Sequence, residues 1–357
     1  MDQSQQGEGA LANTEIDRRR ALTLAAKLGL GSAAMVAALK AGHLDEAVAA
    51  GRNSDLPKKG FHFVFVNHVT TNAFFTPTQA GAADACKLLG CSYSWTGSEN
   101  SIVSEMTKAM QTAIAGKADG IAVAVIDKIA FNAPTSQALA KGIPVLSYNA
   151  DGAPNNGRLA YIGQDLYQSG VGMGQRIVSL VGSGEVGLFI ATPGSLNIQP
   201  RIDGAVAAIK ASGKPITYSQ IATGALESAE RSVVQSWYLG HTGAKGMFAV
   251  DQGSTTGAIL TSRKYGLAAK GLKIGGYDLT PEIVKGVSDG VANFTIDQQP
   301  YLQGFYPILQ LYLYRLSGGL VGAESMNTGI KFVTKSSVAP YLKPNVYQGS
   351  SSSIYQL

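Results

Sequence analysis

Polar and aromatic side chains follow several apolar runs of this chain, at the points where each run gives way to a loop. The set comprises Asn72, Phe74, Phe75, Asn149, Asp151, Arg201, Asp251, Asp278 and Gln298. Hydroxyl groups both donate and accept hydrogen bonds, and their bonds to carboxylates and guanidinium groups are of the stronger, charge-assisted kind. Aromatic rings can pack against the C–H face of a sugar ring. Each residue alone could equally cap a loop, but together they predict a site for a small polyhydroxylated ligand.

Two motifs that look like cofactor or catalytic sites stand in the wrong context. Residues 182–187 match G-x-G-x-x-G, and residues 286–290 match G-x-S-x-G. Dinucleotide-binding loops and nucleophile elbows run from a strand into a helix, whereas both of these segments run from a predicted helix into a predicted strand. We therefore expect two turns, no catalytic residue and no cofactor.

Histidine is too scarce for most metal or nucleophile sites. The four histidines are His43, His62, His68 and His241. A histidine-rich metal cluster is poorly supplied by this set, and we predict no metal site. One histidine would still suffice for a Ser–His–Asp triad. A secreted α/β enzyme acting on a small carbohydrate therefore stays as the alternative function.

The two cysteines, Cys86 and Cys91, flank a predicted helix-to-strand turn. In an oxidising compartment they could form a disulfide. They could equally be two small buried residues, because a spacing of five residues does not fix the distance between their Cα atoms. The sequence leaves both possibilities open.

Strands and helices are predicted to alternate along the chain, with short turns marked by glycine. The predicted strands are 61–66, 91–95, 120–125, 142–148, 187–191, 218–222, 246–250, 272–277 and 291–296, and the predicted helices are 77–89, 101–115, 133–141, 166–180, 198–211, 228–239, 255–265 and 281–287. Continuous apolar strands in such an alternation indicate parallel sheets covered by helices on both faces. The alternation starts again near residue 166, so we expect an α/β fold of two doubly wound lobes. Ligands bind at the carboxyl ends of such strands.

Composition agrees with two globular lobes. The chain has 357 residues, of which 45% are hydrophobic and 15% charged, and this excludes a disordered chain. Two cysteines exclude a disulfide scaffold. The 29 Lys and Arg exceed the 24 Asp and Glu only slightly, and they are scattered. We therefore expect no nucleic-acid partner.

The first fifty residues have the pattern of an export signal. Arg18, Arg19 and Arg20 precede a stretch at 28–39 that contains no charge. This is a basic segment followed by a short hydrophobic one, too short to span a membrane. Consecutive arginines at this place are typical of twin-arginine signals. We predict that residues 1–49 direct export to the periplasm and are removed after Ala49; an amphipathic helix kept in the mature protein is the alternative.

Several segments resemble the type I periplasmic sugar-binding proteins, the ribose-binding-protein-like group of carbohydrate ABC transporters. Residues 71–75 look like the N-x-F-F element of that family, and Arg201 begins a segment similar to its R-x-x-G helix start. Residues 294–300 resemble its hinge strand, with Gln298 at the contact position. Similar segments lie at 142–149, 162–165, 248–251 and 275–281. The resemblance covers about residues 60–340.

The resemblance implies two lobes joined by a three-segment hinge, with crossings near 163–165, 296–299 and 329–332. The implied lobe boundaries are 58–164 plus 299–329 for the N-terminal lobe, and 165–298 plus 330–345 for the C-terminal lobe. It also implies high-affinity capture of a monosaccharide or sugar alcohol by hinge closure, and delivery to a membrane ABC permease. A chemoreceptor is a further partner that such a protein can serve, and we expect a monomer.

Departures from the family pattern leave the ligand open. The family often has Asp-Arg where this chain has Asn149 followed by alanine, so an arginine is absent there unless Asp151 compensates. Many members have Asn at the position of Asp251. Residues 223–225 lack an aromatic that some relatives stack on the sugar, unless Trp237 or a tyrosine fills the place. A pentose, a hexose and a smaller or acyclic polyol all stay open, with a non-sugar polar ligand as the alternative.

Overall fold

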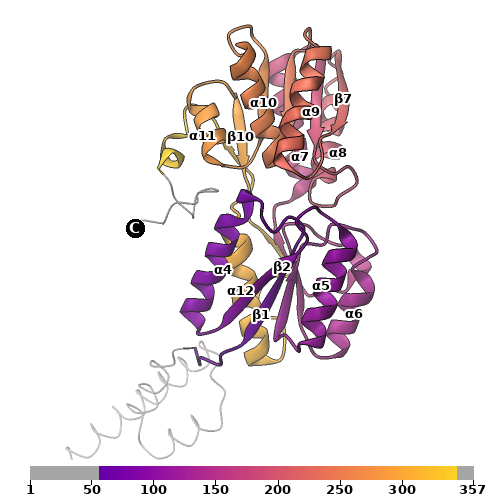
Figure 1. Cartoon of the computed structure of the whole chain (residues 1–357), viewed down its shortest axis with the longest axis vertical. Coiled ribbons are helices and arrows are strands. Elements are labelled where there is room, and N and C mark those ends of the chain that lie inside the picture. Colours follow the sequence, from indigo (N-terminus) through magenta and orange to yellow (C-terminus); the bar gives the residue numbers. More distant parts are fainter. Residues whose placement is uncertain (1–55, 344–357) are drawn as a thin grey trace, which may run out of the picture. The chain divides into compact units, whose positions relative to one another are not determined.

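The computed structural model describes residues 56–343, which form two parallel-sheet α/β lobes (Figure 1). The fold class expected from the sequence is confirmed. The predicted export signal and its cleavage site lie outside the described residues. Within residues 56–343, no helix is long and apolar enough to cross a membrane.

The first lobe is built on a six-stranded sheet in the order β11-β5-β4-β3-β1-β2, in which every pair is parallel. Its strands are β1 (His62–Asn67), β2 (Ser92–Gly97), β3 (Gly120–Val123), β4 (Val145–Tyr148), β5 (Tyr161–Gly163) and β11 (Ser325–Asn327). Its helices are α4 (Thr76–Leu89), α5 (Val103–Ala115), α6 (Asn132–Ala140) and α12 (Leu302–Ser317), with short 3-10 turns η1 (Ala73–Phe75) and η2 (Pro154–Asn156). Helices α4 and α12 pack together on one face of the sheet, and α5 and α6 lie on the other (Figure 1).

The second lobe has its own six-stranded sheet in the order β12-β10-β9-β8-β6-β7. Its strands are β6 (Gly184–Ile190), β7 (Ile216–Ala222), β8 (Gly246–Ala249), β9 (Lys273–Tyr277), β10 (Phe294–Asp297) and β12 (Lys331–Val333). Its helices are α7 (Leu166–Val181), α8 (Gln199–Ala211), α9 (Glu227–Gly240), α10 (Gln252–Tyr265) and α11 (Pro281–Ser288), with the 3-10 turn η3 (Ala339–Leu342). Strand β12 is antiparallel to β10, and the other pairs are parallel.

The apolar runs of the sequence form the interior strands. Strands β3, β4 and β8 are buried along their whole length, as expected for sheets covered on both faces. In the first lobe, the ring of Phe65 stacks on Trp95 at 5.7 Å and meets Tyr148 edge-on at 5.2 Å. A fully buried side chain of this size contributes roughly 1.5–3 kcal/mol to folding.

The chain passes between the two sheets three times. One connection joins β5 to α7, the second joins β10 to α12, and the third joins β11 to β12. These are the places at which the family resemblance put the hinge segments. Helix α12 and strands β5, β11 and β12 were not predicted from the sequence, whereas the predicted strands and helices are present with ends shifted by a few residues.

Both segments rejected as catalytic motifs lead from a helix toward a strand in the structure. Residues 182–187 run from the C-cap of α7 into the first part of β6, and residues 286–290 run from the end of α11 toward β10.

The backbone N–H of Cys91 donates to the Cys86 carbonyl oxygen at 3.0 Å, which closes the end of α4. Both cysteines are free thiols. A hydrogen bond to Cys91 is the main reason that the pKa of the Cys86 thiol is raised.

Candidate ligand-binding site

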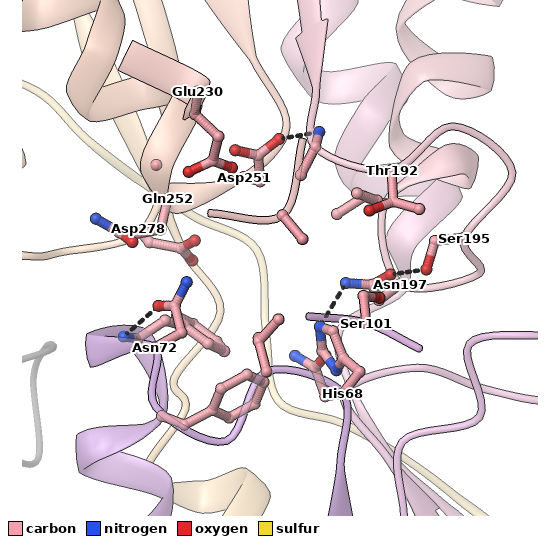
Figure 2. Close-up of a pocket in the computed structure, with 18 of the residues that line it drawn as sticks. His68, Asn72, Ser101, Thr192, Ser195, Asn197, Glu230, Asp251, Gln252 and Asp278 are labelled. Atoms are coloured by element: carbon pink, nitrogen blue, oxygen red, sulfur yellow. Dashed lines mark hydrogen bonds between the residues drawn. The ribbon is translucent and has the colours of Figure 1, made fainter. Parts of the chain in front are cut away.

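A cavity with about 560 Å³ of empty space, its mouth included, is lined by residues of both lobes. The sequence-predicted residues that line it are Asn72, Phe74, Phe75, Asn149, Arg201, Asp251, Asp278 and Gln298. They meet because the carboxyl ends of parallel strands lie at one edge of each sheet. Figure 2 shows this lining.

Asp151 does not line the cavity, so its inclusion among the predicted contacts is corrected. Its carboxylate accepts hydrogen bonds from Arg158 Nε at 2.7 Å and from Arg158 NH2 at 2.6 Å, and a third from Ser147 Oγ at 2.7 Å. These partners hold the carboxylate beside its own loop. Asp151 therefore does not compensate for the arginine that is absent beside Asn149.

An aromatic surface forms the first-lobe side of the cavity. Phe74 and Phe75 lie in η1, where their rings meet edge-on at 4.6 Å. Asn72 fixes this turn, since its Oδ1 accepts from the Phe74 backbone N–H at 2.9 Å. Its amide nitrogen is left to face the cavity (Figure 2). Asn72 thus both positions the aromatic rings and offers a donor.

Asn149 contributes an unpaired acceptor. Its backbone has φ +62°, a left-handed conformation that asparagine tolerates better than most residues. Its side-chain nitrogen donates to Gln303 Oε1 at 3.1 Å, and its Oδ1 is buried with no partner among the described residues. A buried oxygen of this kind at a cavity wall can accept from a ligand hydroxyl.

A buried network on the second lobe links Arg201, Gln298 and Asp278. Arg201 NH1 donates to the Val250 carbonyl oxygen at 2.8 Å, and NH2 donates to Gln298 Oε1 at 2.9 Å. Gln298 Nε2 donates to Asp278 Oδ1 at 2.7 Å. The guanidinium also lies over the Tyr277 ring, 4.1 Å from its centroid. The Arg201 Nε is buried without a partner among the described residues.

Close helix packing sets the place of Arg201. It lies in the first turn of α8, which crosses α7 at two glycines. A Cβ atom on Gly170 would lie 2.1 Å from the Arg201 carbonyl oxygen, and one on Gly204 would lie 2.2 Å from the Tyr167 carbonyl oxygen. Any larger residue at either position would push the helices apart and displace the guanidinium from the network.

The two aspartates of the second lobe have different roles. Burial raises the pKa of Asp278 to about 7, although the Arg201 guanidinium opposes the shift. Asp251 caps α10: its Oδ1 accepts from the Ser254 backbone N–H at 2.9 Å, and its Oδ2 accepts from the Ala191 N–H at 2.8 Å. Asp251 is therefore a structural cap as well as part of the cavity wall.

Sequence reasoning missed His68, Asn197 and Glu230, which also line the cavity. His68 Nε2 faces Asn197 Nδ2 at 3.0 Å, a contact between the lobes, and burial lowers the pKa of His68 to about 3. His68 directly follows a strand, so the rule that found the other residues could have found it. Glu230 lies inside α9, where no signal in the sequence marks it.

The aromatic that some relatives have on the second lobe is not replaced. Trp237 does not line the cavity; its ring stacks on His241 at 4.5 Å and meets Phe189 edge-on. Ala225 and Glu230 line that side instead.

Among residues 56–343, no group of three His, Cys, Asp or Glu side chains could hold a metal ion. The arrangement as a whole can hold hydroxyl groups against one aromatic side.

Comparison with known proteins assigns the family. The periplasmic binding protein domain family matches residues 63–318. The chain is 46% identical to the xylose/arabinose-binding protein XylF of Sulfolobus acidocaldarius, over 96% of this chain and 92% of that protein. A solute-binding protein of Burkholderia graminis in complex with D-arabinose is 26% identical, with a TM-score of 0.74 over 81% of this chain and all of that chain. A carbohydrate transporter protein from Acidothermus cellulolyticus in complex with myo-inositol is 24% identical, with a TM-score of 0.71 over 80% of this chain and 97% of that chain. The chain therefore belongs to the periplasmic binding protein family.

Proposed function

We propose that this protein captures a monosaccharide, with a pentose as the leading ligand, and delivers it to an ABC permease. The observation that carries the proposal is a group of buried polar atoms around one cavity that lack partners among the described residues: Asn149 Oδ1, Arg201 Nε and Glu230 Oε2. Leaving such a group unpaired costs about 1–3 kcal/mol. Hydroxyls of a bound sugar would satisfy all three.

Two relatives support a pentose as the leading ligand. The name of the 46% identical relative records xylose and arabinose, and D-arabinose is bound in the Burkholderia structure. A pentose has hydroxyls to pair with the second-lobe network and C–H groups to pack on Phe74 and Phe75. Hexoses and sugar alcohols follow as second choices.

Closure of the two lobes is the mechanism we propose. Ligand contacts on the first lobe would come from Asn72 and Asn149, and those on the second from Arg201 and Asp278. A ligand that bonds to both lobes favours the closed arrangement by its differential affinity. Gln298 and Gln303 lie where the second connection passes between the lobes, and Gln303 Nε2 donates to Gln298 Oε1 at 3.3 Å.

We infer export by the twin-arginine route, a monomer in the periplasm, and docking of the closed form on the permease, with a chemoreceptor as a further partner. We also propose binding without catalysis. Incubation of D-xylose with the purified protein should return the sugar unchanged by NMR, and turnover would revive the enzyme alternative.

Thermal-shift screening followed by calorimetry tests the ligand class. The panel should hold D-xylose, L-arabinose, D-arabinose, hexoses and polyols, with amino acids and nucleosides as contrasting classes. A ligand at one hundred times its Kd stabilises the folded protein by about 2.7 kcal/mol and raises Tm. Binding of an amino acid or nucleoside without binding of any sugar would contradict the proposal.

A further inference from the structure

Two carboxyl groups face each other on the second-lobe side of the cavity. Glu230 comes from α9 and Asp251 from the N-terminal cap of α10, and Figure 2 shows their carboxyls side by side. Both line the cavity. Glu230 is only 3% exposed, and its Oε2 has no hydrogen-bond partner among the described residues. A buried glutamate at a cavity wall with an unpaired oxygen requires an explanation.

Of the two carboxyl groups, that of Glu230 is the one that carries a proton. Both oxygens of Asp251 already accept from backbone N–H groups, those of Ser254 and Ala191, so Asp251 is held as the acceptor. Burial and the Asp251 carboxylate raise the pKa of Glu230 to about 10; Glu227 adds to the shift and Arg231 opposes it. A protonated carboxyl has one donor and further acceptor capacity. It can therefore donate to Asp251 and still accept from a ligand hydroxyl.

Gly253 makes the room for this carboxyl. It lies in the first turn of α10, and a Cβ atom placed on it would be 1.3 Å from Glu230 Oε2. Any side chain at position 253 would force the Glu230 carboxyl to move. Because the atom in the way is the end of a flexible side chain, such a substitution would displace the carboxyl without requiring the backbone to shift.

We propose that Glu230 is a specificity-determining residue of the sugar site, whose carboxyl, held by Asp251, bonds a ligand hydroxyl on the side that Phe74 and Phe75 do not cover. This rests on the proposed function. The ligand that fits such a wall carries hydroxyls where it faces the second lobe. A sugar that lacks the contacted hydroxyl leaves the Glu230 oxygen buried and unpaired, and it is rejected for that reason.

The test is calorimetry of the full-length protein with D-xylose, L-arabinose and their monodeoxy derivatives. Glu230→Ala should weaken binding of the parent pentose 10- to 100-fold. Glu230→Gln should lose clearly less, because the amide keeps a donor and an acceptor. Gly253→Ala should also weaken binding, by displacing the carboxyl. Glu324→Gln is the matched control: this glutamate is exposed and does not line the cavity, so the variant should bind with the affinity of the wild type.

A comparison of the deoxy sugars identifies the ligand hydroxyl that Glu230 contacts. On the derivative that lacks the contacted hydroxyl, the wild type and Glu230→Ala should bind within about threefold of each other, since the interaction is already lost. If Glu230→Ala fails to fold, Gly253→Ala supplies the same comparison. If wild type and variants bound the parent pentose with equal affinity, or if Glu230→Ala lost the same affinity for every deoxy sugar, this inference would be overturned and the proposed function would stand. A wild type that binds neither pentose would overturn the proposed function, and this inference with it.

Discussion

The cavity has an aromatic wall on the first lobe, formed by Phe74, Phe75 and neutral His68, and a charged wall on the second, formed by Arg201 and Asp278. Polar groups near the aromatic wall mostly hold its backbone, as Asn72 does for the η1 turn. On the charged wall, hydrogen bonds run from one candidate ligand contact to the next through Gln298. Apolar contact is non-directional and supplies affinity, whereas charged donors and acceptors require a partner of matching geometry. The first wall would hold many sugars, and the second would select among them.

The two walls also respond to acid in opposite directions. On the charged wall, burial favours the protonated form of Asp278 and raises its pKa. On the aromatic wall, burial favours the neutral form of His68 and lowers its pKa. Lowering the pH therefore relieves a cost on one lobe and creates one on the other. Variants at these two positions separate the walls in a measurement of stability.

Asp278→Asn should give the largest effect. The pKa of Asp278 is raised from 3.8 to about 7, so the folded state binds this proton more tightly than the unfolded chain does. Binding of this proton stabilises the folded state fully below pH 3.8, the pKa of the unfolded chain, and the stabilisation is lost as the pH rises through 7. At about 1.4 kcal/mol per pKa unit, the loss is at most about 4 kcal/mol. In urea unfolding, Asp278→Asn should be more stable than the wild type at pH 8 and lose that advantage at pH 4.

The matched control is Asp203→Asn, since Asp203 is an exposed residue of α8. Its stability relative to the wild type should be the same at both pH values. If Asp278→Asn behaved in the same way, the charged wall would carry no electrostatic cost and the contrast between the walls would fail.

His68→Gln should show the opposite pH dependence, with a slightly smaller effect. The pKa of His68 falls from 6.5 to about 3 in the folded state, so the wild type loses stability as the pH drops below 6.5. Between pH 6.5 and 4 this amounts to about 3 kcal/mol. Glutamine cannot be protonated and can still bond Asn197. Unfolding measurements should therefore show His68→Gln gaining stability relative to the wild type at pH 4. If the difference in stability between the two proteins were the same at pH 4 and pH 7, the lowered pKa of His68 would be contradicted.

Arg201→Ala should weaken sugar binding by about 2–3 kcal/mol, because it leaves Gln298 and the ligand without a charged donor. Isothermal calorimetry with the best pentose measures this loss. Arg176→Ala is the control: that guanidinium lies over the Phe332 ring at 4.2 Å, and it does not line the cavity. A similar loss in both variants would indicate a general effect of removing positive charge, and the network would not be the cause.

Residues at the ends of apolar strands could be predicted because the geometry of a parallel sheet collects them. Asn72, Arg201 and Asp278 follow or adjoin such strands, and they line one cavity. The two-lobe fold follows from the same alternation. Asp151 satisfied the same rule and was wrongly included, since the pairing of its carboxylate with Arg158 depends on how the loop folds back.

The unpredicted features depend on tertiary packing. Glu230 lies within a helix, and only the approach of α9 to α10 brings it to Asp251. Strands β11 and β12 have three residues each, too few for an alternating pattern to register. Helix α12 contains Pro307, and proline disfavours the interior of a helix. The helix forms nevertheless, because it packs against α4. In each case the neighbouring element decides the local structure.

Phe74→Leu should give the smallest effect and bears on the aromatic wall alone. Leucine keeps an apolar side chain but removes the flat ring, so the affinity for a pentose should fall by about 1 kcal/mol, or roughly fivefold. The loss of affinity should be similar for D-xylose and L-arabinose, because apolar contact depends on the area that is buried and not on the direction of the hydroxyl groups. Phe61→Leu, on an aromatic outside the cavity, should leave both affinities unchanged. A Phe74→Leu variant whose loss differed clearly between the two pentoses would show that the aromatic wall also selects, and the division of roles between the lobes would have to be abandoned.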